Sequence, residues 1–172
     1  MIKSDAKLKK LHEALRTNNK AAIHEAIDLL RDEQPFEGAI GLLAELYNHT
    51  DEHEILKSVE AFMNDIKDQA AAPEVISEIM HDWKPETTRM LVASCWQSGL
   101  DYSSYTREIA EVFFSSDFAT ALECLTVMEE SVHTLKSEEK KELLKFIENK
   151  SLLLKPEIMS LALELKSIIS QG

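Results

Sequence analysis

The sequence has few of the residues that interrupt helices, since only four of its 172 residues are glycine and four are proline. Long apolar runs are also missing, and no stretch approaches the ~18 apolar residues of a membrane-spanning helix. The two cysteines, Cys95 and Cys124, each lie inside an apolar segment, as small core residues do. The charged N-terminus is followed by no apolar signal-peptide segment. We therefore expect a cytoplasmic protein with reduced thiols and no membrane partner.

Positive charge is the next shortage, because the formal net charge is -12. A field of that sign repels nucleic acid and anionic membrane surfaces, so we expect no nucleic-acid partner. The exception is the first predicted helix, where two acids, Asp5 and Glu13, face five cations: Lys3, Lys7, Lys9, Lys10 and Arg16. This basic helix is either a solvated face or a docking surface for an acidic partner.

What the sequence does contain is helical periodicity along almost its whole length. Apolar residues recur at steps of three and four, which places each set on one face of a helix. No segment alternates with the period of two that a half-buried strand shows, so we predict an all-α fold. Clear stripes are Ile55, Val59, Phe62, Met63 and Ile66, and later Ile158, Leu161, Ala162, Leu165, Ile168 and Ile169.

The four prolines precede apolar stripes, and an acid follows each by one or two positions, as at Pro85-Glu86. Proline fits the first helical position, and an acid in the first turn complements the helix dipole. Asp51 and Ser137 add N-cap signals, and Gly99 is a candidate C-terminal cap. The resulting prediction is ten helices over 4–17, 19–31, 35–48, 51–68, 73–82, 85–98, 103–115, 117–134, 137–149 and 156–170.

The short connections predict antiparallel neighbours, and the hairpins begin near residues 4, 35, 73, 103 and 137. A repeat of roughly 30–40 residues is typical of a helical solenoid, here a single domain over 1–172. The middle helix 85–98 is apolar nearly all round and should be covered on several sides. The helix 4–17 has only a narrow leucine stripe and resembles a polar end cap.

Two turns carry a family resemblance. His81-Asp82-Trp83-Lys84-Pro85-Glu86, followed by Met90-Leu91-Val92-Ala93, resembles the turn and second helix of a HEAT repeat, and Asp32-Glu33-Gln34-Pro35 repeats its Asp-to-Pro spacing. Arg89 falls one residue later than the arginine of these repeats, so the resemblance is to a divergent HEAT-like, armadillo-type family. It implies a right-handed α-α superhelix of five hairpins that acts as a protein-interaction scaffold or adaptor.

The resemblance leaves the partner protein unidentified, and a second copy of the chain is compatible with it. An alternative is an enzyme on the same scaffold, of the nucleic-acid glycosylase or lyase type, with Asp82, Trp83 and Trp96 in its groove. Such a groove needs cations to hold phosphate. Residues 71–134 contain three cations against eleven acids, which disfavours this alternative.

Other catalytic chemistry finds little support in the sequence. His49 and His53 have the spacing of a helical zinc pair, but they straddle a predicted helix boundary, so we expect a polar turn and no metal. Neither cysteine lies at a helix N-terminus, where a thiolate would be stabilised. We predict no catalytic residue and no cofactor.

The aromatic residues near the middle of the chain are the candidate protein-binding patch: Trp83, Arg89, Trp96, Tyr102 and Tyr105. Tryptophan, tyrosine and arginine dominate binding hot spots, although the same residues also suit a core between repeats. Gly38 and Gly41 share one face of the predicted helix 35–48. They indicate a close helix crossing without room for a β-carbon.

Overall fold

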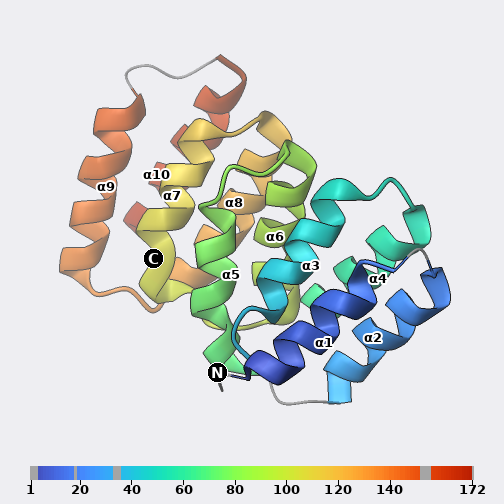
Figure 1. Cartoon of the computed structure of the whole chain (residues 1–172). Coiled ribbons are helices and arrows are strands. Elements are labelled where there is room, and N and C mark those ends of the chain that lie inside the picture. The colour runs from blue at the N-terminus through green and yellow to red at the C-terminus, as the bar shows by residue number, and fades with distance from the viewer. Residues whose placement is uncertain (1–3, 18, 33–35, 152–155, 172) are drawn as a thin grey trace. The chain divides into compact units, whose positions relative to one another are not determined.

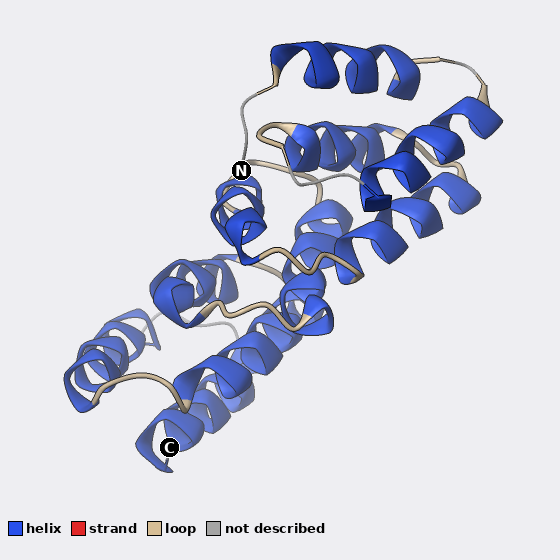
Figure 2. Cartoon of the chain, turned by 90° about the horizontal axis from the view of Figure 1, so that it is seen from below, coloured by secondary structure: helices blue, strands red, loops and turns tan. Residues whose placement is uncertain are grey.

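A computed structural model describes residues 4–17, 19–32, 36–151 and 156–171. Within these ranges it contains ten α-helices, two short 3-10 helices and no strand. Figure 2 shows the helices joined by loops. The predicted all-α class is therefore confirmed. The chain divides into two compact units, Met1–Leu100 and Asp101–Gly172, and each is described by itself. The expectation of one domain over 1–172 stays a prediction.

The first unit contains six α-helices, labelled in Figure 1. Its short 3-10 helix η1, Gln69–Ala71, leads directly into α5. The bounds are α1 Asp5–Leu15, α2 Lys20–Asp32, α3 Ala39–His49, α4 His53–Asn64, α5 Ala72–Ile79 and α6 Pro85–Ser98.

The second unit begins with the 3-10 helix η2, Ser103–Tyr105, and contains four α-helices. They are α7 Thr106–Ser115, α8 Phe118–Val132, α9 Ser137–Ser151 and α10 Pro156–Gln171. Here α7 packs on α8 and α9, and α10 packs on α8 and α9. Fully buried side chains of all four helices form the core: Ile109, Phe113, Met128, Ile147 and Leu165.

In the first unit, each helix packs against its hairpin partner, in the pairs α1 with α2, α3 with α4 and α5 with α6, and against the next helix but one along the chain. The helices α1, α3 and α5 contact one another in series, and α2, α4 and α6 do the same. This alternation arises because each helix carries an apolar stripe wider than one neighbour can cover. Val59 and Leu43 lie in the resulting core with no exposed surface.

The helix α6 has neighbours on several sides. It packs on α3, α4 and α5, and it buries polar as well as apolar side chains. Its serines Ser94 and Ser98 satisfy their hydroxyl groups by donating to carbonyls one turn earlier. The expectation that 85–98 is covered on several sides is confirmed.

Three of the four prolines lie at the start of a helix, as predicted. Pro85 and Pro156 are the first residues of α6 and α10, and Pro73 is the second residue of α5. Pro35 lies outside the described residues. Gly99 ends α6 with a φ of 71°, as predicted. Asp51 is not a cap, because α4 begins after Glu52, whose N–H donates to Thr50 Oγ1.

The start of α3 is held by a carboxylate from another helix. Glu74 of α5 accepts hydrogen bonds from the backbone N–H groups of Gly38, Ile40 and Gly41, at 2.9–3.2 Å. These N–H groups have no partner inside α3, and the carboxylate also complements the positive end of the helix dipole. One side chain therefore joins the first turns of α3 and α5.

The two glycines of this region lack room for a β-carbon, as predicted, but for different reasons. Gly38 is the N-cap of α3 with a φ of 92°, and an added Cβ would lie 2.8 Å from Leu8 Cδ1. Gly41 lies inside α3, and its added Cβ would lie 2.9 Å from Glu78 Oε1. The expectation that both glycines lie inside one helix is wrong, because α3 begins at Ala39.

We predict that Glu74→Ala lowers the free energy of unfolding by about 1–3 kcal/mol, because three backbone N–H groups lose a charged acceptor. Amide hydrogen exchange at Gly38, Ile40 and Gly41 should accelerate. The control is Glu45→Ala, an exposed glutamate of α3, which should change stability by less than ~0.5 kcal/mol. Unchanged exchange at the three amides would contradict the capping role.

Gly38→Ala and Gly99→Ala should differ, although both residues have a positive φ. Each alanine destabilises by about 1 kcal/mol through backbone strain. Gly38→Ala should lower the free energy of unfolding further, because its added Cβ would lie too close to Leu8. Gly99→Ala should show no such additional loss, because a Cβ at Gly99 meets no atom within 4 Å. Urea unfolding measures both. A double-mutant cycle with Leu8→Ala should recover the additional loss at Gly38 and leave Gly99→Ala unchanged.

Candidate protein-binding surfaces

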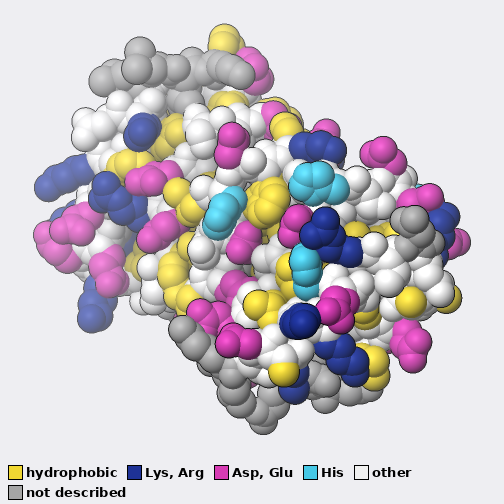
Figure 3. Space-filling model, viewed as in Figure 1, with side chains coloured by type: hydrophobic (Ala, Val, Ile, Leu, Met, Phe, Trp, Pro, Cys, Tyr) yellow, Lys and Arg dark blue, Asp and Glu magenta, His cyan; other side chains and the backbone are white. Residues whose placement is uncertain are grey.

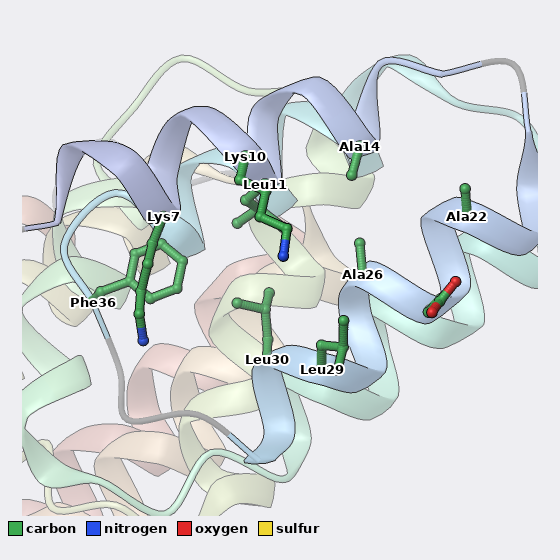
Figure 4. Close-up of a pocket in the computed structure, with 10 residues that line it drawn as sticks. Lys7, Lys10, Leu11, Ala14, Ala22, Ala26, Leu29, Leu30 and Phe36 are labelled. Atoms are coloured by element: carbon green, nitrogen blue, oxygen red, sulfur yellow. The ribbon is translucent and has the colours of Figure 1, made fainter.

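An apolar groove of about 310 Å³ lies between α1 and α2 of the first unit (Figure 4). Its apolar lining comes from both helices: Leu11, Ala14, Ala22, Ala26, Leu29 and Leu30. Phe36, which follows α2, lies at one end and is 3% exposed. The charged lining residues are Lys7 and Lys10 on α1 and Glu25 on α2. The groove is therefore apolar inside and charged only at its edges.

The groove opens on the side of the hairpin that faces away from α4. On α2, His24 Nδ1 lies 2.7 Å from Ser58 Oγ, and Lys20 pairs with Glu52 at 2.6 Å. Both contacts face α4. Ala22 and Ala26 are two residues from His24, and residues at that spacing point to opposite sides of a helix. On α1, the side chain of Leu8 lies beside Gly38, at the start of α3, so this side of α1 faces α3.

Part of this apolar surface meets solvent. Leu29 is 51% exposed, although it is a large hydrophobic residue in a helix with a well-formed buried stripe. Figure 3 shows dark-blue lysine and arginine side chains gathered over the region of α1 and α2. Sequence analysis identified the basic helix but not the groove. The sequence feature that could have indicated the groove is the set of small residues in 21–26, followed by Leu29 and Leu30.

In the first unit, the predicted aromatic patch does not form one cluster. Trp83 lies before α6 and Trp96 near its end, so a rise of 1.5 Å per residue separates them by roughly 17 Å or more. Both tryptophans are half-buried. The indole Nε1 of Trp83 donates to the carbonyl of Glu78 at 2.9 Å, and its ring lies 5.8 Å from His81.

Arg89 lies between the two tryptophans on α6, seven residues before Trp96 and on the same side of the helix. It is half-buried, and its positive charge acts on Tyr47 of α3. Tyr47 donates its hydroxyl to Glu60 Oε1 at 2.6 Å, and burial is the main cause that raises the pKa of this phenol. Arg89 and Trp96 thus share one face of α6.

The two predicted tyrosines belong to the second unit, where the structure brings them together. The rings of Tyr102, which precedes η2, and Tyr105, its last residue, lie 6.4 Å apart at 57°. Tyr102 is only 3% exposed, whereas Tyr105 is half-buried. In the described structure Tyr102 therefore contributes to the core, and only Tyr105 retains a substantial exposed surface.

A second hollow, of about 240 Å³, lies in the second unit between η2, α7 and α9. Phe146 lines it, with the Arg107 guanidinium 5.0 Å and the Lys150 ammonium 5.7 Å from the ring centre. The rest of the lining combines serine, threonine and glutamate side chains with Leu135 and Leu143. This hollow is more polar than the α1–α2 groove, so it offers a partner less apolar surface to bury.

The residues considered for catalysis are either exposed at helix ends or buried in a helix. His49 ends α3 and His53 begins α4, and both side chains are exposed. Cys95 and Cys124 are buried, and neither is in a disulfide. Across residues 4–171, apart from the undescribed segments, no three His, Cys, Asp or Glu side chains are grouped as metal ligands. In the part of the chain that the structure describes, no helix has both the length and the apolar character needed to cross a membrane.

Glu78 of α5 is a partly buried carboxylate whose pKa is shifted by its surroundings. Its carboxylate lies beside Gly41 and 3.6 Å from His81 Nδ1. Burial raises the pKa of Glu78; the charge of Glu74 raises it further, and His81 opposes both. Sequence reasoning did not find this group, because its surroundings come from the approach of α5 to α3.

The sequence matches no protein-family model, and a search of curated proteins found no match. The function is therefore argued from these surfaces.

The raised pKa of Glu78 predicts a pH-dependent effect on stability. Between the ordinary and the raised pKa, the folded chain binds more protons than the unfolded chain, so the free energy of unfolding falls as pH rises. We expect Glu78→Gln to become more stabilising, relative to the wild type, as the pH rises above about 4, the ordinary pKa range of a glutamate. Urea unfolding at several pH values measures this difference. Glu45→Gln, at an exposed site, is the control, and a Glu78→Gln effect that does not change with pH would contradict the assignment.

Proposed function

We propose that the chain is a non-catalytic protein-interaction scaffold or adaptor built from HEAT-like helical hairpins. The observation that carries this proposal is the open apolar groove of α1 and α2, in which Leu29 is half exposed and the charged residues stand at the edges. An apolar surface of this kind, rimmed by polar groups, is typical of a protein-binding site.

The packing within each unit supports the hairpin stack. Helices contact their hairpin partner and the helix two positions along the chain, which is the pattern of a two-layer repeat array. The right-handed superhelix of five hairpins belongs to the same proposal and rests on the HEAT-like turns. A cytoplasmic location is also part of it, because neither Cys95 nor Cys124 is in a disulfide.

The polar groups of the groove give the enzymatic alternative no support. Lys7, Lys10 and Glu25 line an apolar floor and do not form a nucleophile with its base. The residues assigned to a glycosylase groove have other surroundings: Asp82 is exposed, and the Trp83 indole is hydrogen-bonded to the backbone.

The test is affinity capture of partners from a lysate of the source organism, with three baits whose folding is first checked by circular dichroism. The baits are the wild type, Ala26→Arg in the groove and the double variant Trp83→Ala, Trp96→Ala. We expect a stoichiometric protein partner with the wild type that one variant loses, and the variant that loses it identifies the surface. If the captured protein is another copy of the chain, light scattering should show a dimer.

Absence of any protein partner, together with a small molecule that co-purifies with the wild type, would contradict the scaffold proposal.

A further inference from the structure

The groove of α1 and α2 has the dimensions of a helix-binding site. On α2 its lining runs from Ala22 to Leu30, a length of about 12 Å or two helical turns. On α1 the lining residues follow one another at steps of three and four, from Lys7 to Ala14. Both helices therefore present a continuous stripe, and the space between two such stripes follows the axis of a third helix.

Small residues allow a close approach to this groove. Ala14, Ala22 and Ala26 line it, and Figure 4 shows Ala14 of α1 directed towards α2, with Ala26 directed towards α1. The larger Leu29, Leu30 and Phe36 stand at the other end. A partner helix can therefore seat leucine-sized side chains over the alanines and pack against the leucines, in the manner of helix-in-groove recognition.

The charge of the rim selects among such helices. Lys7 and Lys10 stand on the α1 edge, and the Lys7 ammonium lies 5.8 Å from the ring centre of Phe36. In Figure 4 the Lys10 amine is directed towards the groove. This edge is positive in a chain whose net charge is -12. Glu25 on the α2 edge has the opposite charge, so the two edges favour different partner residues.

We propose that the groove binds one amphipathic helix of a partner protein, seated by an apolar stripe, with carboxylates along the edge that faces Lys7 and Lys10. The proposal rests on the scaffold function and names the class of partner at the groove. A small aliphatic carboxylate would also meet lysine and apolar carbon. The open groove, two turns long, with half-exposed Leu29, suits a helix better.

The probe is a fluorescent peptide of about 16 residues, long enough to form helix, with leucines at steps of three and four and glutamates on one flank. A matched peptide has lysines in place of the glutamates. Fluorescence anisotropy with the full chain should show saturable binding of the acidic peptide, roughly tenfold tighter than the basic one at low salt. Added salt should reduce this preference, because the rim charges are exposed.

Two matched pairs of variants locate the site. Ala26→Arg places a charge in the groove and should weaken binding by more than about tenfold, whereas Ala21→Arg, at an exposed site of α2 outside the groove, should not. Lys10→Glu should weaken binding roughly threefold to tenfold. Its control is Lys9→Glu, at an exposed lysine outside the groove that pairs with Glu13 at 3.9 Å. This control should have little effect on peptide binding.

Equal binding of the acidic and basic peptides, or full binding by Ala26→Arg, would overturn the proposal. So would saturable binding of decanoate without binding of the acidic peptide, which would assign the groove to a small carboxylate. The scaffold function is tested separately by the capture experiment. A protein partner that Ala26→Arg retains and the tryptophan variant loses leaves the scaffold in place and moves its binding site out of the groove.

Discussion

A short helix with a wide apolar stripe has to be covered from two directions, and this constraint organises both units of the chain. A hairpin partner covers one side of the stripe, and the helix of the following hairpin covers another. The helix α6 meets the constraint with three neighbours, because α3, α4 and α5 all pack on it. The hairpin of α1 and α2 meets it least, because the side facing away from α4 keeps an apolar groove. The candidate site is thus the place where coverage is incomplete.

Polar contacts between hairpins add specificity to this apolar packing. Glu74 completes the start of α3, and Asn48 of α3 completes the start of α6 by accepting hydrogen bonds from the Lys84 N–H and the Thr87 hydroxyl. In both cases the cap comes from a residue at least 30 positions away in the sequence. Such bonds fix how far one helix is shifted along another, which apolar contacts alone leave adjustable.

Local signals explain why the helices could be predicted and the site could not. Proline at a helix start, glycine at a helix end and spacing of three and four depend on neighbours in sequence, and they located α5, α6 and α10. The cap from Glu74 and the environment of Glu78 depend on helices that meet only after folding. The groove depends on which helix sides stay uncovered. The separation of Trp83 and Trp96 could have been foreseen, because thirteen residues that include most of a helix hold two side chains apart.

The cap on α3 has a consequence for how the first unit can be divided. Repeat proteins are often shortened or extended by whole hairpins, because each repeat carries its own helix caps. Here the hairpin of α3 and α4 does not, since the acceptor for its first turn is supplied by the hairpin that follows. A fragment that ends before residue 74 would therefore lose an N-terminal cap along with a neighbour. The hairpins of this unit are not interchangeable modules, and their order along the chain is built into their hydrogen bonds.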